Sequence, residues 1–113
     1  MSTDLEVYRR RAIVALRAAG PSIKAVACDT LGLPVTAVYA VGSVVDAARF
    51  TEASDIDVAI VVRAPYMRSG LSQELSMKMQ QAMLRRPMGE LGVINTLVFI
   101  GMQSARGRVS RLV

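Results

Sequence analysis

Hydrophobic and polar residues follow two kinds of pattern along this chain, one with a helical period and one typical of buried strands. We expect a first helix that Thr3 or Asp4 caps and that Gly20-Pro21 interrupts. A second helical piece, about Ser22 to Thr30, ends at Leu31-Gly32-Leu33-Pro34, because glycine and proline together stop a helix. The apolar stripe of the first helix consists of Leu5, Tyr8, Ala12, Ala15, Leu16 and Ala19.

Two apolar runs rich in β-branched residues predict strands. The first is Val35 to Val41, which ends at Gly42. The second is Asp55 to Arg63, whose almost unbroken Ile-Val run requires burial on both faces and therefore a place in the centre of the sheet. Between the two strands, Ser43 to about Phe50 is expected to form a short helix or helical turn.

The second half of the chain predicts one further helix and one further strand. Ser72 to Arg86 is amphipathic and ends at Pro87, and Gly92 to Ile100 forms a third strand. Arg108 to Val113 can add an edge strand. The helix has an apolar stripe, whose methionines we interpret as core packing, at Leu75, Met79, Ala82 and Met83.

This order of elements predicts the fold class α/β (α+β), with helices packed on a short mixed sheet. The length of 113 residues, with 52% hydrophobic and 20% charged residues, is typical of one globular domain over residues 1–113. No apolar stretch reaches the roughly 20 residues of a membrane span. The start, Met1 to Glu6, lacks the pattern of a secretory signal, so we expect a cytoplasmic protein without membrane contact.

The composition also limits the metal chemistry and the partners. Cys28 is the only cysteine and histidine is absent, which excludes an intrachain disulfide and His/Cys zinc sites. Any metal would have oxygen ligands, as Mg²⁺, Mn²⁺ or Ca²⁺ prefer. The net charge of +5 admits a nucleic-acid partner, but solvated helix faces and a basic tail are the favoured interpretation because only five aromatic residues are present. The apolar character favours an interface with a partner or with a second copy in a homo-oligomer.

One segment carries the candidate chemistry: Gly42-Ser43, followed after eleven residues by Asp55-Ile56-Asp57. Gly42 has no Cβ, so the backbone can turn sharply and a phosphate can approach closely. Ser43 is expected to cap the short helix and to direct its hydroxyl and the first-turn amides at an anion. Asp55 and Asp57 are two residues apart, so in a strand their side chains point the same way, with Cα atoms about 6.6 Å apart, and both can reach one cation.

Each part of this segment also has an ordinary explanation when it is taken alone. Gly42-Ser43 can be a simple strand-to-helix connection, and the two aspartates can merely begin a strand. Together, however, two like charges on one face before an apolar run are costly unless a cation or a set of donors offsets them. We therefore prefer the interpretation as a metal and phosphate site.

Val38 to Ser43 and Ser54 to Val62 resemble the signature of the DNA polymerase β-like nucleotidyltransferase superfamily, most closely its minimal nucleotidyltransferases. These domains often pair with a helical HEPN protein in toxin-antitoxin modules. The resemblance implies that Gly42 and Ser43 contact nucleoside triphosphate and that Asp55 and Asp57 are catalytic ligands of Mg²⁺ or Mn²⁺. It also implies transfer of a nucleoside monophosphate to an acceptor hydroxyl, with a partner protein as the favoured acceptor and pyrophosphate as the leaving group.

The chain departs from that signature around the glycine turn. The spacer before the aspartates is one residue longer than the commonest one. The Arg and Gly that often follow the Gly-Ser pair are here Val44 and Ala47 or Ala48. Arg49 and Arg63 flank the motif and are candidates for phosphate contacts, although exposed arginines without that role are equally compatible with the sequence.

The third strand also departs from the signature, because it has no acidic residue where a third carboxylate is expected. Asn95 is the expected occupant, on one strand face with Val93, Leu97 and Phe99. An amide can accept a hydrogen bond from metal-bound water but cannot remove a proton. Glu90, in the preceding turn, is the alternative source of a carboxylate. The absence of an acidic residue keeps open a second hypothesis, a catalytically weakened nucleotide-binding or antitoxin module that pairs with a HEPN-type protein.

Overall fold

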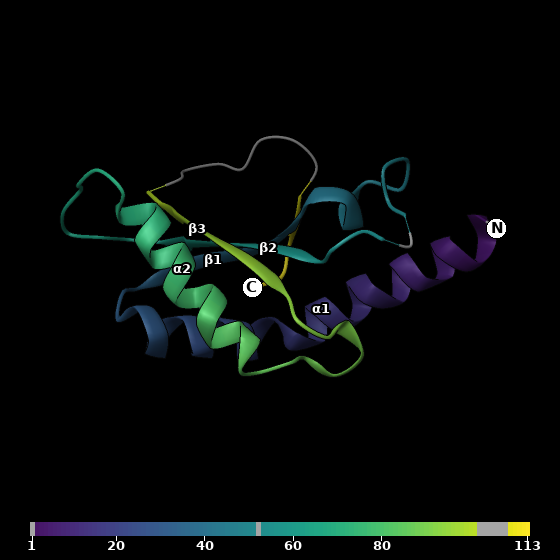
Figure 1. Cartoon of the computed structure of the whole chain (residues 1–113), viewed down its shortest axis with the longest axis horizontal. Coiled ribbons are helices and arrows are strands. Elements are labelled where there is room, and N and C mark those ends of the chain that lie inside the picture. Colours follow the sequence, from purple (N-terminus) through teal and green to yellow (C-terminus); the bar gives the residue numbers. More distant parts are fainter. Residues whose placement is uncertain (1, 52, 102–108) are drawn as a thin grey trace.

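The computed structural model describes residues 2–51, 53–101 and 109–113, and its elements follow the order helix, strand, strand, helix, strand, strand (Figure 1). The two α-helices are α1 (Ser2–Leu31) and α2 (Leu71–Leu84). Two short 3₁₀ helices are η1 (Gly42–Val45) and η2 (Gly89–Leu91). The strands are β1 (Val35–Val41), β2 (Asp57–Val62), β3 (Asn95–Ile100) and β4 (Ser110–Arg111).

The four strands form one mixed sheet in the order β3-β2-β1-β4. β1 runs antiparallel to both β2 and β4, whereas β2 and β3 are parallel. The expected α+β class and mixed sheet are confirmed, as are the internal position of β2 and the edge strand near the C-terminus. Much of the expected basic tail, Gly101 to Val113, lies outside the described residues, because these exclude residues 102–108.

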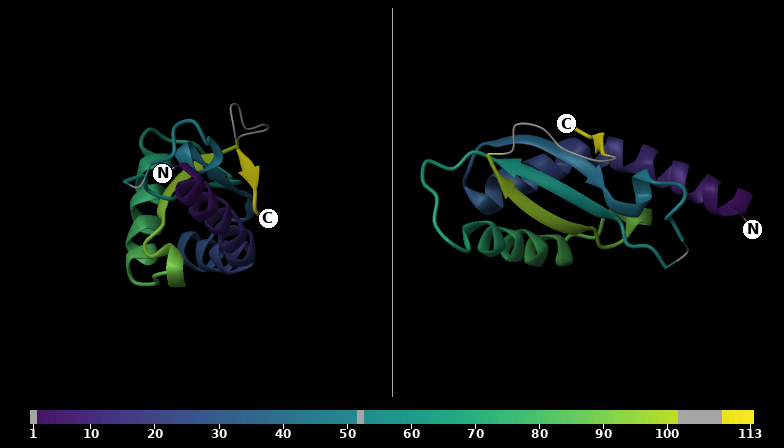
Figure 2. Two further views of the ribbon diagram at one scale, coloured as in Figure 1. Left: turned by 90° about the vertical axis from the view of Figure 1, so that its right-hand side faces the viewer. Right: turned by 90° about the horizontal axis from the view of Figure 1, so that it is seen from above.

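Both α-helices lie on one face of the sheet, and the hydrophobic core fills the space between them and the strands (Figure 2). Alternate strand residues point into this core, as a period of two requires. Met79 and Met83 are completely buried, which confirms their interpretation as core residues. The main contributors to the core are Leu16, Ile23 and Ala27 of α1, Val38 and Ala40 of β1, Val58, Ile60 and Val62 of β2, Leu75, Met79 and Met83 of α2, and Val98 of β3.

The break expected at Gly20-Pro21 is wrong, because α1 is one continuous helix with Pro21 inside it. Gly20 has a different reason to be glycine: a Cβ there would lie 2.8 Å from the Val113 side chain and 2.9 Å from the Leu112 carbonyl oxygen. Pro21 cannot donate to the Arg17 carbonyl, but both residues are exposed, so water can replace that bond. Burial of the helix on either side of this position therefore outweighs the local tendency to break.

The start of α1 also differs from the expectation. The helix begins at Ser2, so Thr3 and Asp4 lie inside it and do not precede it as caps. Asp4 instead occupies the first turn, where a carboxylate interacts favourably with the positive end of the helix dipole. Among the described residues, no helix combines the length and the apolar character needed to cross a membrane.

Side chains of α2 hydrogen-bond the outer edge of β3, which is an edge strand of the sheet in the described part of the chain. Three polar residues at successive intervals of four line the helix: Ser72, Ser76 and Gln80. Ser76 Oγ accepts the Val98 N–H at 2.8 Å, Gln80 Oε1 accepts the Thr96 N–H at 2.7 Å, and the Ser72 hydroxyl donates to the Val98 carbonyl. Because unpaired edge groups invite aggregation, these bonds both anchor the helix and protect the sheet.

Candidate functional site

The backbone at Gly42 lies directly against the carboxylate of Asp57. Val41, the last residue of β1, is the cross-strand partner of Asp57, the first residue of β2. The chain then turns through Gly42 with φ 77°, a conformation that favours glycine. A Cβ at Gly42 would lie only 2.8 Å from Asp57 Oδ2. Glycine is therefore needed here both for the turn and for the close approach of backbone and carboxylate.

Asn95 lies on the other side of Asp57. The two are Cα partners in the parallel β2–β3 pair, and the Asn95 N–H donates to the Ile56 carbonyl at 2.9 Å. The Asn95 side chain acts on the Asp57 carboxyl and lowers its pKa. Leu97 and Phe99 are exposed on the same strand face, as alternation requires. The structure thus brings Gly42, Asp57 and Asn95 together at one end of three neighbouring strand segments.

Asp55 contributes to this group from outside the sheet. Since β2 begins at Asp57, the expectation that both aspartates belong to the strand is wrong. Burial nevertheless alternates through this stretch, with Asp55 exposed, Ile56 buried and Asp57 half-buried. Even so, the negative charge of Asp55 acts on Asp57 and raises the pKa of its carboxyl.

The electrostatics of Asp57 reflect this environment. Burial raises the pKa of the Asp57 carboxyl, and the negative charge of Asp55 raises it further. The hydrogen bond from Asn95 acts in the opposite direction and lowers this pKa, but it does not compensate fully. The ionised form of Asp57 is therefore incompletely stabilised by the protein, and a cation placed beside the two carboxylates would stabilise it.

Ser43 does not have the capping role expected from the sequence. η1 starts at Gly42, and its N-cap residue, Val41, makes no side-chain capping hydrogen bond. The four-residue 3₁₀ helix offers fewer free amides than an α-helix would. Ser43 accepts the Asp46 N–H on its carbonyl oxygen at 3.0 Å, and no hydrogen bond among the described residues uses its hydroxyl. That hydroxyl, half-buried beside Gly42, is available to a ligand.

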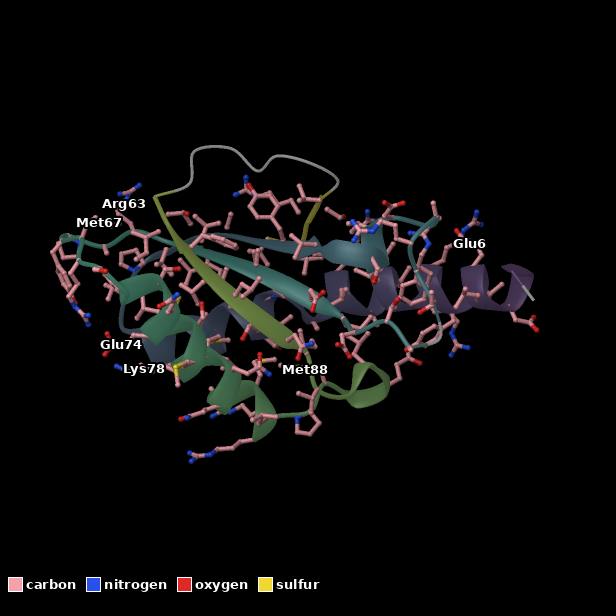
Figure 3. All side chains as sticks on the ribbon, turned by 45° about the horizontal axis from the view of Figure 1, so that its top comes forward. Glu6, Arg63, Met67, Glu74, Lys78 and Met88 are labelled. Carbon is pink, nitrogen blue, oxygen red and sulfur yellow. The ribbon has the colours of Figure 1, made fainter. Side chains whose placement is uncertain are left out.

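Other residues considered from the sequence lie elsewhere. Glu90, in η2, pairs with Arg11 of α1 at 3.3 Å. Arg63 follows the last residue of β2 and is thus about 20 Å along the strand from Asp57. Figure 3 shows Arg63 and Glu6 at opposite ends of the molecule. Arg49 is exposed on the loop after η1, where its N–H donates to the Asp46 carbonyl.

The sequence interpretation missed one residue that contacts the glycine turn. Arg9 is one of three consecutive arginines, Arg9-Arg10-Arg11, for which a solvated helix face is the interpretation that the sequence favours, yet its side chain is only 14% exposed. Its Nη1 donates to the Val44 carbonyl of η1 at 3.0 Å. Glu6, three residues earlier on α1, was the available signal, because a carboxylate at this spacing can hold the arginine in place.

No protein-family model, curated protein or solved structure matches this chain significantly. The chemistry of the site is consequently the basis on which a function can be proposed. Within the described residues, no group of three or more His, Cys, Asp or Glu side chains gathers to hold a metal ion. The pair Asp55 and Asp57 still fits Mg²⁺, which commonly takes one or two carboxylates and completes its octahedron with water and substrate phosphates.

Proposed function

We propose that this chain is a nucleotidyltransferase-type domain that binds a nucleoside triphosphate with Mg²⁺ or Mn²⁺ and transfers the nucleoside monophosphate to a hydroxyl, with a partner protein as the favoured acceptor. The observation that carries the proposal is that the Asp57 carboxylate lies beside the Gly42 turn, where an added Cβ would be only 2.8 Å from Asp57 Oδ2. It juxtaposes a turn that a phosphate can approach with a carboxylate whose charge the protein leaves partly uncompensated.

The proposed roles follow from this arrangement. Asp55 and Asp57 would hold the cation, and Gly42 and Ser43 would accept the triphosphate beside it. When bound, the metal would neutralise charge on the transferring phosphate and activate the nucleophile. The chain's own contribution is to bring anionic substrate and carboxylates close together, which is unfavourable without a cation between them.

The test is calorimetry with Mn²⁺ alone and with Mn²⁺·ATP. Asp57→Ala should abolish both binding events and leave the fold intact, because the half-buried carboxylate at the strand start is removed. Glu90→Gln is the matched control: it removes an exposed carboxylate that pairs with Arg11, and it should bind as the wild type does. Unchanged Mn²⁺·ATP binding by Asp57→Ala would exclude the proposed site, and loss in Glu90→Gln would make Glu90 the missing carboxylate.

Asn95 favours a second candidate function, a catalytically weakened nucleotide-binding or antitoxin module that pairs with a HEPN-type protein. An amide bonded to Asp57 supports the shape of the site but cannot act as a general base, a role worth about 10²- to 10⁴-fold in rate. Under the enzyme proposal the wild type transfers slowly, and Asn95→Asp raises turnover without greatly tightening nucleotide binding.

The measurement is transfer of labelled nucleotide to candidate acceptors, including a HEPN-type protein. Asn95→Gln is the control, since it keeps the amide and changes only its reach. An Asn95→Asp protein that folds and binds nucleotide but transfers nothing to any acceptor would favour the binding module. Rapid transfer by the wild type would instead show that asparagine at position 95 does not slow the transfer reaction.

A further inference from the structure

Arg9 connects the first helix to the glycine turn, although the two are far apart in sequence. Its Nη1 donates to the Val44 carbonyl at 3.0 Å, across a separation of 35 residues. The Val44 side chain is completely buried. Backbone and side chain of this residue are thus fixed from two directions, by the guanidinium and by the core.

Glu6 holds the guanidinium itself in place. Arg9 Nε and Nη2 donate to Glu6 Oε2 and Oε1 at 2.9 and 2.7 Å, a bidentate geometry that fixes the plane of the guanidinium. The hydrogen bond from Arg9 is the main reason that the pKa of Glu6 falls to about 2, so this carboxylate stays charged across the physiological range. The three nitrogens of Arg9 are therefore all engaged, and the side chain has one preferred position.

The turn that Arg9 holds determines the gap at the candidate site. Gly42 and Ser43 directly precede Val44, and a Cβ added at Gly42 would lie only 2.8 Å from Asp57 Oδ2. A displacement of about 1 Å in a substrate-positioning element can cost about 10²-fold in rate. The distance between the turn and Asp57 thus depends on the contacts that fix Val44.

We propose that Arg9 is a positioning residue that sets the distance between the Gly42-Ser43 turn and the Asp57 carboxylate. The predicted effect of Arg9 on nucleotide binding rests on the proposed function. The predicted effect of Arg9 on the position of the turn does not. Arg9 touches neither carboxylate of the site among its described contacts, and it acts through the Val44 carbonyl.

The chain offers a matched control in Arg10. Arg10 also hydrogen-bonds Glu6, with Nε to Oε1 at 3.0 Å, but its side chain is 75% exposed and makes no described contact with η1. Arg9→Gln and Arg10→Gln therefore remove the same charge from the same helix and weaken the same carboxylate contact. They differ in their contacts with the turn, because within the described residues only Arg9 bonds the Val44 carbonyl and interacts electrostatically with Asp46.

Two measurements test the proposal. The first is amide hydrogen exchange by NMR at Asp46, whose N–H bonds the Ser43 carbonyl within the turn. Arg9→Gln should speed this exchange about tenfold, as expected for loss of one charge-assisted hydrogen bond, and Arg10→Gln should not. The second is calorimetry, in which Arg9→Gln should weaken Mn²⁺·ATP binding about tenfold and leave binding of Mn²⁺ alone unchanged.

The outcomes separate this inference from the proposed function. Wild-type exchange at Asp46 in Arg9→Gln, or equal acceleration in Arg10→Gln, would overturn the positioning role whatever the nucleotide result. If exchange at Asp46 is accelerated in Arg9→Gln but the wild type itself binds no Mn²⁺·ATP, the role of Arg9 is supported and the proposed function is rejected. If Arg9→Gln does not fold, Arg9→Lys gives the same test, because it keeps the charge and one donor but loses the bidentate fork. Arg9→Lys should keep only part of the wild-type protection of the Asp46 amide against hydrogen exchange.

Discussion

Two polar clusters lie beside β3, and they differ in how completely the protein's own groups supply their hydrogen bonds and compensate their charges. On the outer edge, Ser76 and Gln80 of α2 meet backbone N–H groups at 2.8 and 2.7 Å. On the exposed face, burial and the repelling charge of Asp55 raise the pKa of Asp57, and Asn95 offsets this rise only in part. Polar residues whose bonds are complete within the chain stabilise the fold. Those left with uncompensated charge are the ones available to a ligand.

This difference predicts that substitutions in the two clusters have opposite effects. Changes at the edge of β3 should lower the free energy of unfolding and leave ligand binding unchanged. Changes at the exposed end of β2 should remove binding with little loss of stability. A substitution that affects both properties equally would break the distinction.

After the complete loss of binding expected for Asp57→Ala, the largest effect is expected from Gly42→Ala. The new Cβ meets Asp57 Oδ2 and must displace either the turn or the carboxylate, so Mn²⁺·ATP affinity should fall at least about 100-fold in calorimetry. Gly32→Ala is the matched control, because Gly32 has φ 64° but no atom within 4 Å of its added Cβ. Both variants should lose about 1–2 kcal/mol of stability through backbone strain. Comparable nucleotide affinity in the two would show that the Gly42–Asp57 contact has no binding role.

The second effect is one of stability alone. Gln80→Leu removes the acceptor for the N–H of Thr96, a residue that is only 4% exposed, and leaves that group unpaired. Chemical denaturation should show a loss of about 1–3 kcal/mol, with Mn²⁺ binding unchanged. Gln81→Leu changes the neighbouring, exposed glutamine and should alter stability by less than about 0.5 kcal/mol. An equal loss in the two variants would mean that the edge bonds do not anchor α2.

The sequence predicted the elements that hydrophobic periodicity specifies directly. β1, the central β2 and α2 with its buried Leu75, Met79 and Met83 were all identified, because burial of apolar residues determines them. It failed at Gly20-Pro21, where glycine serves close packing against Leu112. A contact between residues so far apart in the chain leaves no local signal.

The candidate site was predictable in composition but not in detail. Gly42 and Asp57 were selected from local pattern and Asn95 from the resemblance to the nucleotidyltransferase signature, and strand register brings the three together. The position of Asp55 ahead of β2 and the missing cap at Ser43 depend on where one strand starts and on a 3₁₀ rather than an α-helical turn. Such boundaries are set by a few competing hydrogen bonds, which the sequence does not rank.

The smallest effect expected is the pH dependence of stability in Asp57→Asn. Because the folded-state pKa of Asp57 is raised above its ordinary 3.8, the folded protein holds a proton that the unfolded chain has released between these two values. Stability due to Asp57 is therefore lost as pH rises from 3.8 through the raised pKa, and asparagine removes this loss. Asp57→Asn should be more stable than the wild type at neutral pH, by less than about 1 kcal/mol because solvent screens a partly exposed carboxylate. The difference should vanish below pH 3.8, as measured by thermal unfolding across the pH series.

Saturating Mn²⁺ should raise the stability of the wild type at neutral pH but not that of Asp57→Asn, because a cation can compensate the charge only where the carboxylate is present. A wild type that is more stable than Asp57→Asn at neutral pH without metal would mean that the protein already compensates this charge, and the contrast with the edge of β3 would be lost.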